Sequence, residues 1–173
     1  MGQISDCVNR LAASATFAMM QKSNELAAQG VNVVNMSVGE PDFNTPDYVK
    51  NAAKQAIDEN YSTYSPVPGY MSLRKACSDK LKRENNLDYA PTQIVVSTGA
   101  KQSLCNAIMA VVNPGDEVLL PSPCWVSYPE MVKLAGGVPV VIKAGIEQDF
   151  KVTAQQIADA ITPKTKAIMI CSP

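Results

Sequence analysis

Short apolar runs alternate with helix-forming segments through the second half of the chain. The runs are residues 94–98, 118–120, 138–142 and 166–170, and the segments between them carry apolar residues at helical spacing. Strands that are apolar on both faces are typical of a sheet covered by helices on either side. The pattern therefore predicts an α/β fold, in which ligands bind beyond the carboxyl ends of the strands.

The first of these runs leads into a glycine turn. Residues 94–98 have a strand pattern, Gly99 interrupts it, and helical spacing begins at Lys101. A helix N-terminus offers unpaired N–H groups and a positive dipole end, and a glycine lets a ligand approach the backbone, so the junction suits a phosphate. The same pattern also fits an ordinary strand-to-helix turn, because it is neither G-x-G-x-x-G nor a Walker loop.

Other short signals place further elements. Residues 31–34 read as a short strand, and Thr45 and Pro46 predict a helix start with Thr45 as N-cap. Pro139 has no backbone donor and indicates either an edge strand or the start of a strand, and Thr153 with Gln156 forms a capping-box pattern. Trp125 follows the run 118–120, so topology predicts that it lies at the same sheet edge as Gly99.

Composition excludes several classes of function. The chain has no histidine, which removes Ser-His-Asp and Cys-His catalysis and histidine-based metal sites. The net charge of -1, with no basic run, argues against a nucleic-acid partner. Five widely spaced cysteines without a C-x-x-C motif are typical of a reduced, cytoplasmic protein. Glu40 and Asp42 do not complete a calcium-loop spacing, so no metal site is predicted.

The N-terminal segment needs a separate decision between a targeting signal and a helix. Residues 11–20 are mostly apolar, but polar residues interrupt them and an acidic residue precedes them, so an amphipathic helix is the better interpretation. No segment approaches the ~18–20 apolar residues that cross a bilayer, and no membrane association is expected.

Five motifs give the chain a resemblance to a known family. They are Ser37-Val38-Gly39-Glu40-Pro41-Asp42-Phe43, Tyr64-Ser65-Pro66 with Gly69, Ser97-Thr98-Gly99-Ala100-Lys101-Gln102, Asn113-Pro114-Gly115-Asp116-Glu117-Val118, and Trp125-Val126-Ser127-Tyr128-Pro129-Glu130-Met131. In this order and spacing, they resemble the N-terminal part of a class I, fold-type I aminotransferase of the aspartate aminotransferase type. The resemblance runs from about residue 14 to 173.

The resemblance implies pyridoxal 5'-phosphate as cofactor and an amino acid and a 2-oxo acid as substrates. Gly99, Ala100 and Lys101 would hold the cofactor phosphate, and Tyr64 would reach the phosphate of a neighbouring subunit in a homodimer. Trp125 would stack on the pyridine ring and border the substrate, whose carboxylate would lie against the Gly39 backbone. Without the family, Trp125 would read as a plain core tryptophan.

The resemblance also implies a domain organisation. Residues 1–45 would form an N-terminal helical arm and part of a small domain. Residues 46–173 would form the first, incomplete part of a large cofactor-binding domain with a three-layer αβα sheet, truncated after residue 173.

The family's Schiff-base lysine has no counterpart, because none of the lysines here lies in a matching motif, and no catalytic residue is assigned. The chain alone is therefore expected to be inactive, and the preferred amino donor stays open. A non-catalytic α/β module that binds a phosphate ligand or only assembles is the alternative. A dinucleotide-binding oxidoreductase lacks its glycine fingerprint.

Overall fold

The computed structural model describes residues 4–37 and 39–172. The chain divides into two compact units, each described by itself. The sheet unit comprises residues 1–38 and 104–173, and the helical unit comprises residues 39–103.

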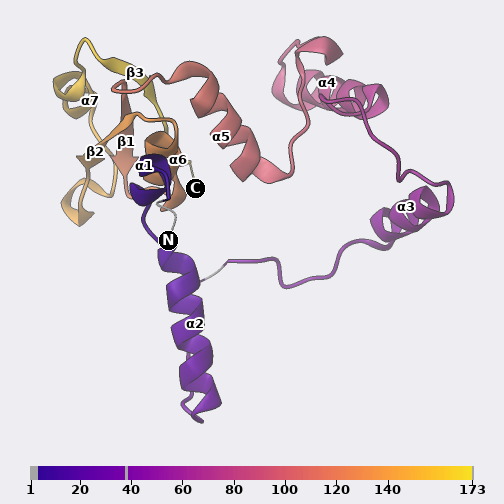
Figure 1. Ribbon diagram of the computed structural model, residues 1–173, viewed down its shortest axis with the longest axis horizontal. Helices are drawn as coiled ribbons and strands as arrows, with labels where there is room; N and C mark the ends of the chain where they lie inside the picture. The colour runs from indigo at the N-terminus through magenta and orange to yellow at the C-terminus, as the bar shows by residue number, and fades with distance from the viewer. Residues whose placement is uncertain (1–3, 38, 173) are drawn as a thin grey trace. The chain divides into compact units, whose positions relative to one another are not determined.

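A parallel sheet is the centre of the sheet unit (Figure 1). Its strands are β1 (Glu117–Ser122), β2 (Val138–Lys143) and β3 (Thr165–Ile168), in the order β2-β1-β3. In the register of this sheet, Leu119 of β1 is paired with Val140 on one side and Ile168 on the other. The strands predicted at 118–120, 138–142 and 166–170 are confirmed, with β3 beginning and ending slightly earlier than expected.

Helices cover both faces of this sheet. Side chains alternate along β1, so Val118 and Leu120 face one side and Leu119 faces the other. The first two pack in a buried cluster with side chains from α5 (Gly99–Val111), α6 (Ser127–Leu134) and neighbouring segments: Ile108, Val112, Val132 and Met169. On the opposite face, Leu119 shares a hollow with Ile157 of α7 (Ala154–Ala160). This layering is the predicted α/β architecture.

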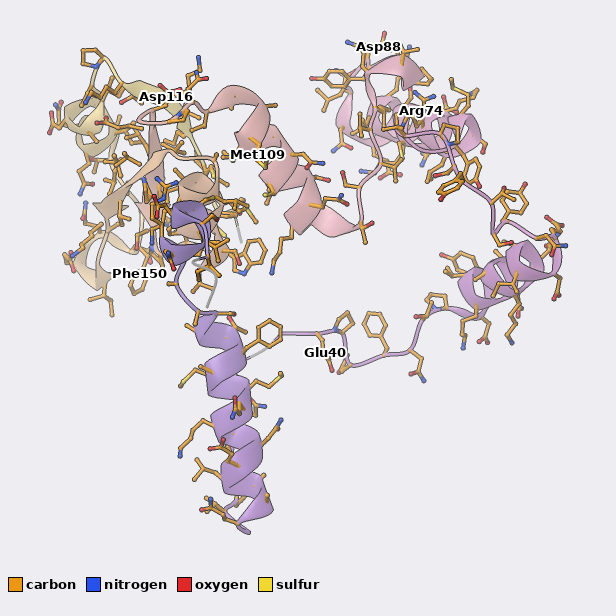
Figure 2. The ribbon with its side chains drawn as sticks, viewed as in Figure 1. Glu40, Arg74, Asp88, Met109, Asp116 and Phe150 are labelled. Atoms are coloured by element: carbon orange, nitrogen blue, oxygen red, sulfur yellow. The ribbon has the colours of Figure 1, made fainter. Side chains whose placement is uncertain are left out.

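Local signals account for several details of the sheet unit. Pro139 lies in β2, an outer strand, as predicted. The Gln156 N–H donates to Thr153 Oγ1 (3.2 Å) and the Thr153 N–H donates to Gln156 Oε1 (2.9 Å), which confirms the capping box of α7. The turn before β1 is closed by Asp116, whose Oδ2 accepts the Asn113 N–H at 2.8 Å (Figure 2).

Two helices lie in the N-terminal segment of the sheet unit. The first, α1 (Asp6–Asn9), is capped by Ser5 and contacts α6, where Glu130 Oε2 accepts the Ala12 N–H at 2.7 Å. The second, α2 (Ala15–Ala28), is capped by Ser14 and confirms the helix predicted for this segment, although none of its residues is buried. The 3-10 turn η2 (Ile146–Gln148) follows β2.

The helical unit contains α3 (Asp47–Asp58), α4 (Met71–Asn85) and the 3-10 turn η1 (Pro91–Gln93). Arg74 Nη1 of α4 donates to the Pro91 carbonyl at 3.2 Å, and Ser78 Oγ donates to the Tyr89 carbonyl at 2.5 Å. These two bonds hold η1 against α4. The prediction of Thr45 as N-cap was wrong, because Pro46 has extended backbone (ψ 143°) and is itself the cap, without a side-chain bond.

Two predicted strands are absent from the described residues. The segment 94–98 has extended backbone at Ile94, but no strand pairs with it, and the Val96 N–H donates instead to the Pro68 carbonyl at 3.0 Å. Residues 31–34 also form no strand. A β-ladder requires a neighbouring strand, and an apolar run cannot supply one by itself.

Candidate functional site

The predicted glycine turn lies at the start of α5. Gly99 has φ +80°, a region that residues with a Cβ rarely adopt, and a Cβ built there would meet nothing within 4 Å. The Gly99 N–H donates to the Ser97 carbonyl at 2.9 Å, and the Thr98 N–H donates to Gln102 Oε1 at 2.5 Å. The turn is thus fixed by short-range bonds, and its outer face is open to a ligand.

The first turn of α5 has the properties of an anion site. Gly99, Ala100 and Lys101 are all exposed, and α5 is 13 residues long, which gives it a developed dipole. An amide such as that of Ala100 has no carbonyl one helical turn earlier to accept its hydrogen. The open space over Gly99 and this helix end therefore fit a phosphate group.

Within the helical unit, two of the five motifs lie together. A hollow of about 390 Å³ is lined by residues of both: Ser65, Val67, Gly69, Tyr70, Leu73, Val96, Ser97, Thr98 and Gln102. The backbone at Gly69, which has φ +95°, lies so close to Val96 that a Cβ at position 69 would be only 2.9 Å from Val96 Cγ2. This close approach therefore requires glycine at position 69. The loop after Tyr64 and the segment before Gly99 therefore form one polar-lined surface.

The other residues predicted in the helical unit are exposed. The Tyr64 side chain is fully accessible, which leaves its hydroxyl available to another molecule. Gly39 lies in an exposed loop, and a Cβ built there would meet nothing within 4 Å. Its motif neighbour Val38 lies outside the described residues. The roles predicted for Tyr64 and Gly39 stay predictions.

Trp125 lies in the loop between β1 and α6 of the sheet unit. Its ring meets Tyr128 edge-on, with centroids 5.7 Å apart and an interplanar angle of 84°. Tyr128 and Cys124 pack against the buried cluster, whereas the half-buried Trp125 is not part of it. The indole is therefore held by Tyr128 and partly accessible, and its predicted ring-stacking role stays a prediction.

Ser65 and Tyr128 lie in the sequence motifs without a predicted role, and Tyr70 lies outside those motifs. Ser65 and Tyr70 line the hollow, and Tyr128 supports Trp125. Burial raises the pKa of Tyr128, and the neighbouring Cys171 raises it further. The spacing of Trp125 and Tyr128 by three residues could have indicated their contact, since such residues adjoin at a helix start.

The Gly99 turn and Trp125 belong to different units. Their meeting in one cleft stays a prediction. Among residues 4–37 and 39–172, no three histidine, cysteine or acidic side chains gather in a way that could hold a metal ion.

Comparison with known protein families decides the classification. The model of the family "Aminotransferase class I and II" matches residues 31–173. The chain belongs to this aminotransferase family. The match includes the Gly39, Tyr64, Gly99 and Trp125 motifs and confirms the resemblance.

Two relatives of this chain have names that include aspartate aminotransferase or aspartate/prephenate aminotransferase. It is 50% identical over its whole length to an aspartate/prephenate aminotransferase of Cereibacter sphaeroides, covering 43% of that protein. It is 48% identical to an aspartate aminotransferase of a Bacillus species, with 96% of this chain and 42% of the relative covered. The chain therefore spans less than half the length of these relatives.

Solved structures agree with the family assignment. An aspartate aminotransferase of Thermus thermophilus, solved with maleate, matches 98% of this aminotransferase chain with a TM-score of 0.92 and 44% identity, over 44% of its own length.

In the described part of the chain, no helix has both the length and the apolar character that crossing a membrane would take.

Proposed function

We propose that this chain is the N-terminal part of a pyridoxal-phosphate-dependent aminotransferase that passes an amino group from an aspartate-like amino acid to a 2-oxo acid. The family match over residues 31–173 carries the proposal. The names of the relatives support aspartate as the donor class. No observation favours the non-catalytic module or the dinucleotide-binding oxidoreductase.

The residues present fit the cofactor. Gly99, Ala100 and Lys101 offer an exposed helix N-terminus with open space above the glycine, which suits the phosphate. Trp125 offers a flat ring held by Tyr128, which suits an electron-poor pyridine. When bound, pyridoxal phosphate supplies an electron sink for the α-carbon of the amino acid.

The proposal assigns further roles to the exposed loops. Gly39 would face the substrate carboxylate through its backbone. Tyr64, whose side chain is fully accessible, would reach the phosphate bound by a second subunit, so the complete protein would be a homodimer. The setting would be cytoplasmic and the process biosynthetic, in amino acid metabolism.

The described residues do not include the whole catalytic machinery that the proposal requires. No lysine of the chain lies in the motif that would hold the cofactor covalently, and a base is needed to move the α-proton. We therefore expect the chain alone to give no turnover with aspartate and a 2-oxo acid. It would also give no borohydride-reducible absorbance band that saturates at one equivalent of cofactor. Either signal would contradict the expected inactivity.

The cofactor pocket itself can be tested with the fluorescence of Trp125, the single tryptophan. Pyridoxal phosphate is expected to quench this emission saturably, and inorganic phosphate to relieve the quenching by competition. Gly99→Ala should weaken binding at least several-fold. Gly115→Ala is the matched control, because Gly115 has φ +89° and equal open space but lies in the turn before β1. Quenching that never saturates, or that both variants weaken equally, would overturn the pocket.

Reading the DNA beyond codon 173 tests the proposed parent enzyme separately. A continuing frame that encodes the missing lysine motif is expected. An immediate stop codon would reduce the proposal to a remnant that shares the family's fold.

A further inference from the structure

Two cysteines that are far apart in sequence lie at the ends of neighbouring strands. In the parallel register of β1 and β3, Leu119 is level with Ile168, and the Met169 N–H donates to the Leu119 carbonyl at 2.9 Å. If the same register is extended three residues beyond the last residue pair of β1 and β3, Cys171 comes level with Ser122. Cys124 follows Ser122 by two residues, so both thiols lie at the same carboxyl edge of the sheet.

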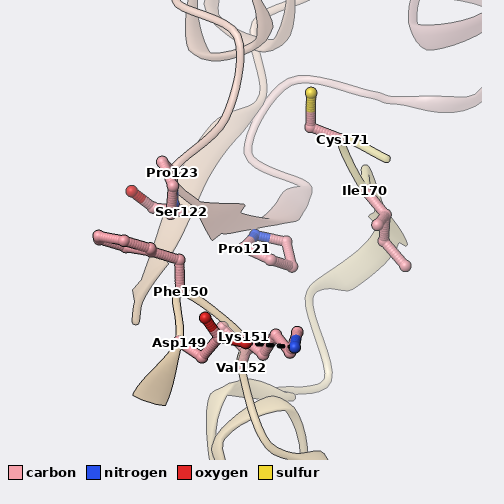
Figure 3. Close-up of a pocket in the computed structure, with 9 residues that line it drawn as sticks. All are labelled: Pro121, Ser122, Pro123, Asp149, Phe150, Lys151, Val152, Ile170 and Cys171. Carbon is pink, nitrogen blue, oxygen red and sulfur yellow. Dashed lines mark hydrogen bonds and ion pairs between the residues drawn. The ribbon is translucent and has the colours of Figure 1, made fainter. Parts of the chain in front are cut away.

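The two thiols differ in accessibility. Cys124 is half-buried and packs against the central cluster of the sheet unit. Cys171 is exposed and lines a cavity of about 480 Å³ together with Pro121, Pro123 and Phe150 (Figure 3). A small molecule can therefore reach Cys171 more readily than the half-buried Cys124.

The thiols also interact with one another and with a phenol. Burial raises the pKa of Cys124, and the charge of a Cys171 thiolate raises it further. Besides burial, Cys171 and, to a smaller extent, Cys124 raise the pKa of the neighbouring Tyr128. These interactions agree with the strand register in bringing Cys124 and Cys171 into one group.

We propose that Cys171 and Cys124 form a dithiol site that a small-molecule disulfide, such as oxidised glutathione, converts into an intramolecular disulfide. The Cys171 thiolate attacks one sulfur of the oxidant, forming a mixed disulfide and releasing one glutathione thiolate, which takes up a proton. The Cys124 thiolate then attacks the Cys171 sulfur and releases the second glutathione. Two protein thiols lose two electrons and two protons in total, and one glutathione disulfide becomes two thiols.

The remaining cysteines supply internal controls. Cys7 lies in α1, where its Sγ donates to the Leu134 carbonyl at 3.3 Å, and Cys77 lies in α4. Cys105 lies in α5 with its Sγ 4.0 Å from Met109 Sδ. Cys105 shares a tryptic peptide with Cys124, since no lysine or arginine separates them, and so it is the control that mapping needs most.

The test treats the reduced native protein with oxidised glutathione, blocks the remaining thiols and maps disulfides by mass spectrometry. We expect loss of two of the five thiols and a link between the peptide containing Cys124 and the peptide that begins at Ala167. C105S should form the same link. C124S should stop at glutathione attached to Cys171, and C171S should form no intramolecular disulfide.

Two results of the disulfide mapping would overturn the proposal. One is a link that persists in C124S, which would assign it to Cys105. The other is a wild-type protein that stops at the mixed disulfide.

A repeat in denaturant should abolish the preference for this pair, because it depends on the fold. A monosubstituted trivalent arsenical, which needs two adjacent thiols, should bind wild type and C105S at one equivalent and lose at least tenfold in affinity for C124S and C171S. Equal binding by all four proteins would contradict the site. The dithiol rests on the sheet unit alone, so this test is independent of the proposed aminotransferase activity.

Discussion

The sheet unit and the helical unit differ in how they bury apolar side chains. Every buried residue of the described chain lies between Ile108 and Met169, in the sheet unit. In residues 39–103 no side chain is buried, and large apolar groups such as Ile57 are 75% exposed. Hydrophobic burial is the main favourable contribution to folding. The sheet unit therefore has a stabilising core of its own, whereas the helical unit depends on local hydrogen bonds and helix propensity.

The largest test of this contrast is the loss of a core side chain. Leu120→Ala in β1 removes a side chain that is 0% exposed, so we expect a loss of about 2–5 kcal/mol in the free energy of unfolding. Ile57→Ala in α3 is the counterpart and should change it by no more than about 0.5 kcal/mol. Urea unfolding monitored by circular dichroism measures both. Equal losses would show that the helical unit also has a core.

A second comparison adds a methyl group to one glycine in each unit. A Cβ at Gly137 would lie 2.7 Å from Val112 Cγ1 and 3.0 Å from Val132 Cγ1, so Gly137→Ala should cost about 1–3 kcal/mol through overpacking. A Cβ at Gly39 would meet nothing within 4 Å, and Gly39→Ala should be neutral or slightly stabilising. Thermal unfolding of both variants checks this. A Gly137→Ala protein as stable as wild type would mean that the core has room.

Helix capping gives a smaller contrast. Thr153→Ala removes a cap of α7 that the structure shows bonded to the Gln156 N–H, and should cost about 1 kcal/mol. Thr45 lies before α3, whose N-cap Pro46 makes no side-chain bond. Thr45→Ala should therefore change the free energy of unfolding by no more than about 0.5 kcal/mol. Denaturant midpoints measure the difference. A larger effect at Thr45 would revive the N-cap role that the structure contradicts.

The smallest expected effect concerns pH. A hydrogen bond from Lys133, joined by the Ala12 N–H, lowers the pKa of Glu130 from its ordinary value of 4.5. A lowered folded-state pKa stabilises the fold above the unfolded value, and this contribution is lost as the pH falls through the folded pKa. With Glu130 about a quarter exposed (26%), solvent screening limits it to about 0.5 kcal/mol.

Glu84 of α4 is the counterpart for the pH comparison. Its pKa is also lowered, chiefly by the Arg83 hydrogen bond and then by Lys80, but its side chain is 49% exposed. Unfolding measured from pH 7 down to pH 3 should show a reduced acid dependence for Glu130→Gln and little change for Glu84→Gln. The reverse order would place the stronger electrostatic contribution in the helical unit.

Local sequence signals predicted the parts of the fold that depend on neighbours in the chain. The apolar run 118–120 became the buried centre of β1, and Thr153 with Gln156 capped α7. Gly99 lies at the turn that leads into α5, as predicted, and has φ +80°. In each case the interacting groups lie within a few residues of one another or within one strand.

Features that the sequence did not predict correctly involve contacts with residues far away in the chain, which no local pattern specifies. The segment 94–98 is as apolar as β1, yet no strand of the described chain pairs with it. The approach of the loop 65–70 to Val96 depends on the absence of a Cβ at Gly69, and the proposed pairing of Cys124 with Cys171 depends on the β1–β3 register. The site residues were predicted through motifs, and the meeting of the Gly99 turn with Trp125 in one cleft stays a prediction.

Pro139 makes the two edges of the sheet, β2 and β3, differ in their backbone hydrogen-bonding groups. The Val138 N–H bonds inward to the Asp116 carbonyl, and successive residues of a strand alternate, so the nitrogen of Pro139 faces outward. The free border of β2 therefore lacks a donor near the start of the strand, while β3 has no proline between Thr165 and Ile168. An added polypeptide strand would find a complete row of hydrogen-bonding groups only beside β3, so the sheet can grow on one side and is closed to growth on the other.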